Sequence, residues 1–161
     1  MPKQEPPAQR IHPAMVKLIH EMSRPETRTK LLGEAGRDLT PIDVDLLRAI
    51  IARGPVRATD LSDSQAVDKS TITPQIRRLE RRELVTRQTD PTDRRAVLLT
   101  ATDLGLQTCQ RMDSAGTEVI ETALSQWPKQ EQALFATLFC RFVDDLDDQP
   151  AKERVRPHID P

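Results

Sequence analysis

Tyrosine is absent from this chain, and aromatic residues make up only 2% of its 161 residues. A core without large rings must be built from Leu, Ile, Val and Ala. Hydrophobic residues account for 37% of the chain, which is low for a self-sufficient globule. This composition predicts a subunit that completes its core by forming a dimer.

Cysteine is scarce as well, since Cys109 and Cys140 are the two in the chain. Two cysteines so far apart predict neither a disulfide framework nor a zinc finger. His12 and His20 lie more than two helical turns apart, so they do not form a chelating pair. We therefore expect no bound metal and no cofactor.

Long apolar runs are also missing. No stretch is apolar enough to span a bilayer, and the first residues lack the apolar region of a signal peptide. With five glycines in the chain, there is neither a glycine-rich phosphate loop nor a nucleophile elbow. These absences predict a cytoplasmic protein with no membrane partner, no catalytic residues and no enzymatic activity.

The most informative stretch begins with a predicted helix from Asp68 or Lys69 to Arg82. Ile72, Ile76 and Leu79 recur at i, i+4 and i+7, so they share one face of that helix. The opposite face carries hydroxyl and guanidinium groups from Ser70, Thr73, Arg77, Arg78 and Arg81. An apolar back with such a front is typical of a helix that enters the DNA major groove.

A β-hairpin is predicted after this helix, with strands at 84–88 and 96–99. Asp90 and Pro91 favour a turn between the strands, and Arg94 and Arg95 lie at the tip. From Lys69 to Arg95 the chain has eight Lys or Arg residues and four acids, whereas the whole chain has 24 basic and 25 acidic residues. A cationic segment within a neutral protein indicates binding to phosphates, and the alternative is a solvated helix face.

These residues resemble the MarR family of bacterial winged helix-turn-helix regulators. The resemblance is carried by Val67–Thr73, Arg78-Leu79-Glu80, Leu84-Val85, Asp93-Arg94-Arg95 with Leu99-Thr100, and Gly105, and it spans roughly residues 10–147. It implies a mainly α fold with a small β-wing, in which N- and C-terminal helices join two subunits. The implied function is a homodimeric repressor that binds a pseudo-palindromic operator in double-stranded DNA.

The resemblance also assigns roles to residues. The predicted DNA-binding residues are Lys69, Ser70, Thr71, Thr73, Pro74, Gln75, Arg77, Arg78, Arg94 and Arg95. Arg77 or Arg78 would read guanine, and Arg94 would enter the minor groove with Arg95 as its backup. Asp93 would orient Arg94 or cap backbone amides of the loop. The family further implies an effector pocket between the dimer helices and the DNA-binding lobe, often for small anionic aromatics.

Five regions are expected along the chain. Residues 1–12 form a mobile arm, and residues 13–36 form N-terminal dimerisation helices that start near Pro13 and break at Pro25. Residues 37–100 form the DNA-binding lobe, with a helix 41–53 capped by Thr40, a strand near 56–58 and a short helix 60–65 capped by Thr59. Residues 101–148 form two C-terminal dimerisation helices, and residues 149–161 form a disordered tail.

The expected dimer interface combines two apolar stripes. They consist of Met15, Leu18, Ile19 and Met22 near the N-terminus, and Phe135, Phe139, Phe142, Val143 and Leu146 near the C-terminus. The N-terminal stripe is also compatible with ordinary core packing.

Two other functions are compatible with the sequence. One is a thiol redox switch at Cys109 or Cys140, although we expect both to be buried as small hydrophobic residues. The other is a winged helix that binds an acidic protein partner through the same basic face.

Overall fold

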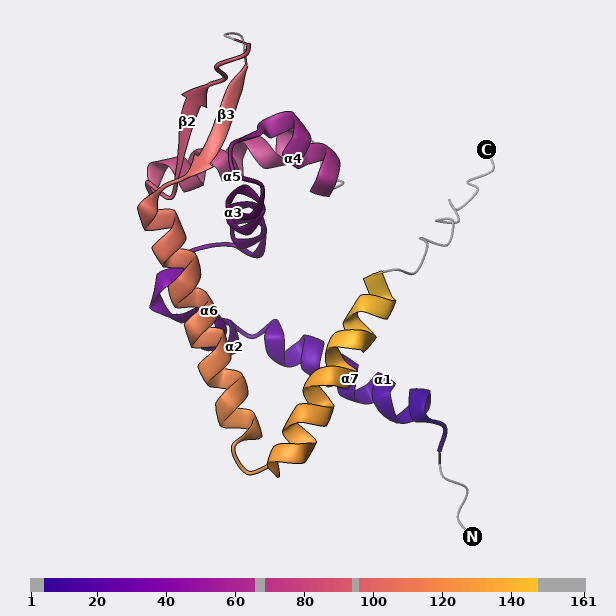
Figure 1. Cartoon of the computed structure of the whole chain (residues 1–161). Coiled ribbons are helices and arrows are strands. Elements are labelled where there is room, and N and C mark those ends of the chain that lie inside the picture. The colour runs from indigo at the N-terminus through magenta and orange to yellow at the C-terminus, as the bar shows by residue number, and fades with distance from the viewer. Residues whose placement is uncertain (1–4, 66–68, 94–95, 148–161) are drawn as a thin grey trace, which may run out of the picture. The chain divides into compact units, whose positions relative to one another are not determined.

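A computed structural model describes residues 5–65, 69–93 and 96–147, with the side chains of 62–65, 69–71 and 147 outside the description (Figure 1). The elements are, in chain order, α1 (Pro7–Met22), α2 (Pro25–Gly36), α3 (Pro41–Arg53), β1 (Val56–Arg57), α4 (Ala58–Gln65), α5 (Lys69–Arg81), β2 (Val85–Thr89), β3 (Val97–Ala101), α6 (Asp103–Leu124) and α7 (Lys129–Asp147). The fold is mainly helical with one small antiparallel sheet, as predicted. It divides into two compact units, Met1–Ile120 and Glu121–Pro161.

Helix α1 begins at Pro7, earlier than the predicted start near Pro13, and Pro13 lies inside the helix. Pro7 occupies the first turn, where a missing N–H costs nothing and the fixed φ favours the helix. The break at Pro25 is confirmed, because α2 starts there. Within α2, Gly33 adopts φ 60° and ψ −175° and separates two helical pieces.

Helix α3 follows its sequence signals. Thr40 caps it through a reciprocal box, in which the Asp43 N–H donates to Thr40 Oγ1 at 3.2 Å and the Thr40 N–H donates to Asp43 Oδ2 at 2.8 Å. Gly54 ends the helix with φ 72°. The prediction that Thr59 caps the next helix was wrong, because α4 starts at Ala58 directly after β1 and includes Thr59.

The three strands form one sheet in the order β1-β3-β2. Val56 pairs with Leu99, and the β2–β3 hairpin runs in register from Val85 opposite Ala101 to Thr89 opposite Val97. The hairpin projects from the helices as the wing (Figure 1). The predicted helix with Pro74 in its interior is confirmed as α5.

Helix α6 is tied to the end of the sheet by its N-cap. Thr102 accepts the Gly105 N–H at 3.0 Å and donates its hydroxyl to the Glu83 carbonyl at 2.6 Å. A Cβ at Gly105 would lie 2.2 Å from the carbonyl oxygen of Leu84, the residue before β2, so the close approach of α6 to that backbone requires glycine.

The core of the first unit is aliphatic, as the composition predicts. Its buried residues come mainly from α3, from α4 and α5 (the helix-turn-helix), from the sheet and from the first half of α6. They are Leu39, Val44, Leu46, Leu47, Ile50, Val56, Leu61, Ile72, Ile76, Leu79, Leu84, Val85, Leu99, Cys109 and Met112.

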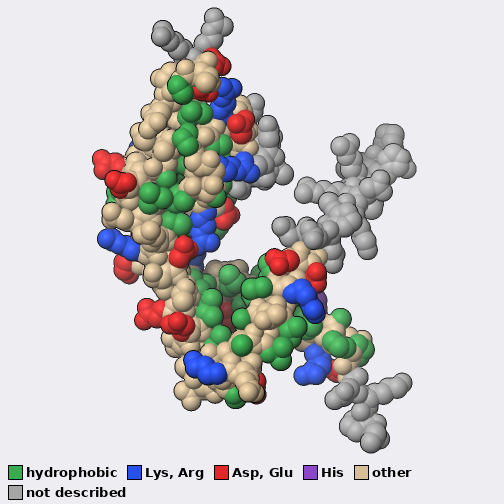
Figure 2. Space-filling model, viewed as in Figure 1, with side chains coloured by type: hydrophobic (Ala, Val, Ile, Leu, Met, Phe, Trp, Pro, Cys, Tyr) green, Lys and Arg blue, Asp and Glu red, His purple; other side chains and the backbone are tan. Residues whose placement is uncertain are grey.

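The second unit has no comparable core among its described residues. Along α7, Leu134, Phe135, Leu138, Phe139, Val143 and Leu146 are exposed, and hydrophobic side chains gather there in Figure 2. Trp127 and Phe135 lie 5.4 Å apart between ring centroids, and Phe135 and Phe139 lie 5.5 Å apart. Cys140 is exposed on this helix, so the prediction that both cysteines are buried was wrong for Cys140 and right for Cys109.

None of the helices in the described ranges combines the length and apolarity that a membrane crossing requires. Likewise, no group of three or more His, Cys, Asp or Glu side chains in those ranges is placed to hold a metal ion.

Candidate nucleic-acid interface

Helix α5 separates its apolar and polar residues as the sequence predicts. Ile72, Ile76 and Leu79 are at most 2% exposed and anchor the helix on the core. Thr73, Pro74 and Arg77 are exposed, and Gln75 is half-buried. Lys69, Ser70 and Thr71 belong to the first turn of α5, but their side chains lie outside the description.

Arg78 differs from its neighbour Arg77 because it faces the core of the lobe. Its Nε lies 3.4 Å from Oδ1 of Asp43, whose side chain is fully buried. That oxygen has no hydrogen-bond partner among the described atoms, so the contact is an ion pair without hydrogen-bond geometry. Arg78 therefore links α5 to the start of α3.

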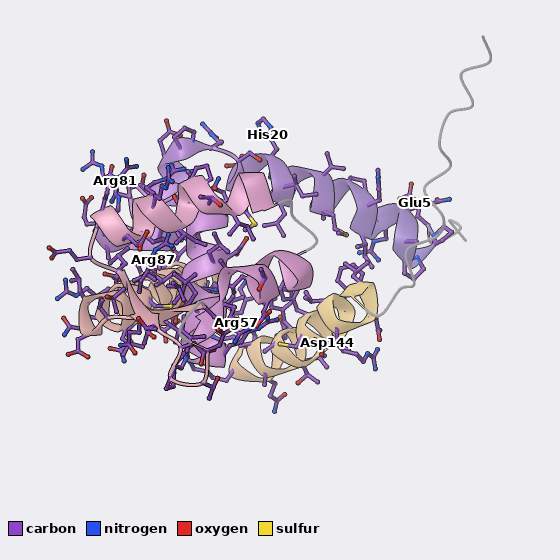
Figure 3. The ribbon with its side chains drawn as sticks, turned by 90° about the horizontal axis from the view of Figure 1, so that it is seen from above. Glu5, His20, Arg57, Arg81, Arg87 and Asp144 are labelled. Atoms are coloured by element: carbon purple, nitrogen blue, oxygen red, sulfur yellow. The ribbon has the colours of Figure 1, made fainter. Side chains whose placement is uncertain are left out.

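Other basic residues near α5 are also engaged. Arg82 Nη2 lies 3.7 Å from Asp38 Oδ2, and Arg87 on β2 pairs with Glu80, with Nη2 at 3.1 Å from Oε2. In contrast, Arg77 and Arg81 form no ion pair with any residue in the described ranges. Figure 3 shows Arg81 extending outward from the end of α5. Among the side chains of α5 that the structure describes, the free positive charge therefore lies with Arg77 and Arg81.

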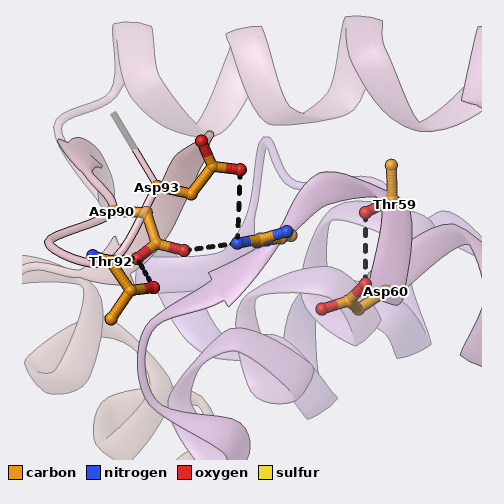
Figure 4. Close-up of polar contacts among 6 residues, drawn as sticks. Thr59, Asp60, Asp90, Thr92 and Asp93 are labelled. Atoms are coloured by element: carbon orange, nitrogen blue, oxygen red, sulfur yellow. Dashed lines mark hydrogen bonds and ion pairs between the residues drawn. The ribbon is translucent and has the colours of Figure 1, made fainter. Parts of the chain in front are cut away.

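The base of the wing holds a polar network that the sequence reasoning missed. Arg57 Nη2 on β1 lies 2.6 Å from Asp90 Oδ2 and 3.9 Å from Asp93 Oδ2 (Figure 4). The other oxygen of Asp90 accepts the Thr92 N–H at 2.8 Å and the Thr92 hydroxyl at 2.6 Å. The sequence pattern indicates a turn at Asp90, and an Asp before Pro is the signal that could have predicted this Asx turn.

These contacts have clear electrostatic consequences. Hydrogen bonds from Thr92, followed by the hydrogen bond from Arg57, hold the pKa of Asp90 well below its usual range. The hydrogen bond with Asp90 raises the pKa of Arg57 in turn. Both side chains therefore stay charged at neutral pH. Arg94 and Arg95 follow Asp93 in the sequence and lie outside the described residues.

Cys109 lies on α6 near Asp113, with its Sγ 3.9 Å from Asp113 Oδ2. Burial, and then the Asp113 carboxylate, raises the pKa of the Cys109 thiol. A thiol with a raised pKa is a poor nucleophile at neutral pH, so this environment does not favour a redox switch at Cys109.

Comparison with known proteins agrees with this geometry. The MarR family model matches residues 39–97, which run from just before α3 through α4, α5 and β2 to the first residue of β3. The chain is 38% identical over 103 residues to the HTH-type transcriptional regulator YxaD of Bacillus subtilis, covering 62% of this chain and 72% of that protein. The chain belongs to the MarR family.

Two further similarities extend this assignment. This member of the MarR family is 30% identical over 106 residues to the HTH-type transcriptional repressor NicR of Pseudomonas putida, and the match covers 66% of this chain and 67% of that protein. Its fold matches a crystal structure of Streptococcus pneumoniae FabT in complex with DNA, with a TM-score of 0.70, 20% identity, and coverage of 89% and 99% of the two chains. This MarR protein is thus a winged helix-turn-helix transcriptional regulator.

Proposed function

We propose that the protein is a homodimeric repressor that binds a pseudo-palindromic operator in double-stranded DNA. The observation that carries this proposal is the outer face of α5, where Arg77 and Arg81 are free of ion pairs within the described residues while the opposite face is buried. Such a helix supplies unpaired guanidinium groups to phosphates and to guanine edges. FabT has been crystallised with DNA and NicR is a repressor, which supports the same role here.

The homodimer is supported by apolar surface that needs a partner. Helix α1 buries none of its residues, and Ile11, Val16, Leu18, Ile19 and Met22 are exposed. The second unit exposes apolar side chains along α7, among them Phe135, Leu138 and Phe139. Surfaces of this kind mark protein–protein contacts. Two-fold symmetry would present two copies of α5 to half-sites one helical turn apart, roughly 34 Å.

Within the first unit, a cavity of about 520 Å³ is the candidate effector site. Most of its apolar lining comes from Met22, Leu31, Leu32, Pro41, Val44, Met112 and Ile120. Its charged lining residues are Arg28, Asp45, Arg48 and Asp113. Arg28 donates to the Leu39 carbonyl, and Arg48 pairs with Asp113. Its volume suits a small molecule. Because no aromatic side chain lines the cavity, aliphatic contacts would hold the effector.

The proposed function is tested by selecting bound fragments from a sheared genomic library with excess competitor DNA at near-physiological salt. We expect enrichment of a palindrome whose half-site spacing reflects the dimer. Salt-labile binding without enrichment would contradict sequence-specific recognition and would favour the acidic-protein partner instead. Genes beside the enriched sites would then supply small molecules to test for release of the protein from its operator.

A further inference from the structure

Arg57 joins the first strand of the sheet to the turn of the wing. Its guanidinium contacts Asp90, which immediately follows β2, and lies near Asp93 on the same loop. Because β3 lies between β1 and β2, this side chain bridges the outer strands at the loop end of the hairpin. Arg57 is not among the DNA-binding residues that the sequence predicts.

The loop beyond Asp90 is closed by its own backbone. The Asp90 N–H donates to the Ala96 carbonyl at 3.0 Å, and the Ala96 N–H donates to the Asp93 carbonyl at 2.8 Å. The Thr92 N–H and hydroxyl both donate to Oδ1 of Asp90, whose side chain is 8% exposed. Hydrogen bonds therefore hold residues 90–93 together, and the Arg57–Asp90 contact attaches them to β1.

We propose that Arg57 is a positioning residue for DNA binding, which sets the wing relative to the helix-turn-helix. Arg57 is the last residue of β1, and α4 begins at the next residue, Ala58. The Arg57–Asp90 pair thus connects the wing loop directly to the start of the helix-turn-helix. Arg94 and Arg95, the predicted wing arginines, directly follow Asp93 in the sequence. The inference rests on the proposed DNA-binding function.

A direct phosphate contact by Arg57 is the competing role, and the local charges disfavour it. Two carboxylates already compensate the guanidinium, and the 2.6 Å contact with Asp90 is a charge-assisted hydrogen bond. A phosphate could meet another nitrogen of the same guanidinium, but Asp90 and Asp93 offset its positive charge and would repel a third anion beside them.

The two roles differ in a double-mutant cycle with Arg57→Gln, Asp90→Asn and the double variant, measured as the Kd for the selected operator. A positioning role predicts that each single change weakens binding about ten-fold and that the double variant is no weaker than either. Both single changes should also reduce the preference for A·T over G·C at the base pairs that flank each half-site. A direct contact predicts instead that Asp90→Asn leaves binding intact while Arg57→Gln weakens it, and that result would overturn the inference.

Controls separate folding from positioning. Arg37→Gln removes the same charge from an exposed residue that pairs with Glu34 on α2, and it should bind like wild type. If Arg57→Gln does not fold, Arg57→Lys replaces it in the cycle, because it keeps the charge and loses the planar fork. Failure of the wild-type protein to bind any DNA would overturn the proposed function itself. If the wild-type protein binds DNA but the effects of the two substitutions on the Kd are additive, the positioning role of Arg57 is overturned while the proposed function stands.

Discussion

Arg77 and Arg78 are neighbours in the sequence, but their surroundings give them different tasks. Arg78 is half-buried and lies against the buried carboxylate of Asp43, which ties α5 to α3. Arg77 is exposed and forms no ion pair in the described part of the chain. Of these two predicted guanine readers, Arg77 therefore fits the proposed DNA contact better.

Changing Arg77→Ala should remove discrimination at one base pair of each half-site. A bidentate contact with guanine contributes about 1–3 kcal/mol, so the preference for the cognate base should fall by roughly 5- to 150-fold. Competition between operators that differ at single positions measures this effect. Arg37→Ala is the matched control, and an evenly weakened affinity with unchanged base preference would assign Arg77 to a phosphate instead.

Asp90 gives the wing a predictable response to acid. Because its folded pKa is depressed below the unfolded value near 4, its contribution to stability is present above about pH 4 and is lost as pH falls through the folded pKa. Asp90→Asn should therefore be less stable than wild type at pH 7, with a difference that narrows below about pH 4. Urea unfolding of both proteins between pH 7 and pH 3 measures this difference, and a gap independent of pH would contradict it.

Among the elements, helix α5 contains a proline in its interior, where the missing N–H costs a backbone hydrogen bond. Pro74 is exposed in the helix interior and cannot donate to the carbonyl of Ser70. The buried contacts of Ile72, Ile76 and Leu79 hold the helix together on both sides of this interruption. Tertiary packing therefore outweighs the local cost.

Pro74→Ala should raise the stability of the protein. The restored hydrogen bond and the removed clash favour the helix by up to about 3 kcal/mol, while the greater freedom of the unfolded chain offsets about 0.4–1 kcal/mol. A net gain of roughly 1–2 kcal/mol is expected in the free energy of unfolding, measured by urea titration. Equal or lower stability would mean that the first turn of α5 already departs from helical bonding.

At the scale of the whole molecule, the main feature is apolar surface that the single chain leaves exposed. In the second unit, α7 exposes Phe135, Leu138, Phe139 and Val143 within one side of the helix, while Thr137 lies on the opposite side. We attribute the apolar side to the proposed homodimer.

Phe139→Asp should convert the dimer to monomers, because the change removes a buried ring and places an unpaired charge in the interface. The dimer Kd should rise at least about 100-fold, as measured by sedimentation equilibrium. Operator affinity should fall with it, since one half-site then acts alone. Thr137→Asp adds the same charge to the polar side and should remain dimeric; dissociation by both variants alike would exclude a specific interface on the apolar side.

Local chemistry was sufficient to predict most of the elements. The Thr40 cap of α3 and the 3.6-residue spacing of Ile72, Ile76 and Leu79 act over a few residues, so the sequence reveals them. The start of α1 and the role of Thr59 were missed because several residues nearby could begin a helix and local signals did not rank them.

The sequence by itself determined the fold class, the family and the segment of α5 that faces outward, since these depend on periodicity and on short motifs. Only the tertiary structure decided which charges of that segment are free. Arg78 meets Asp43, and Arg57 meets Asp90, across 35 and 33 positions of the chain (78 − 43 and 90 − 57). Ion pairs between distant residues depend on how helices and strands are packed, and no local pattern in the sequence encodes that packing.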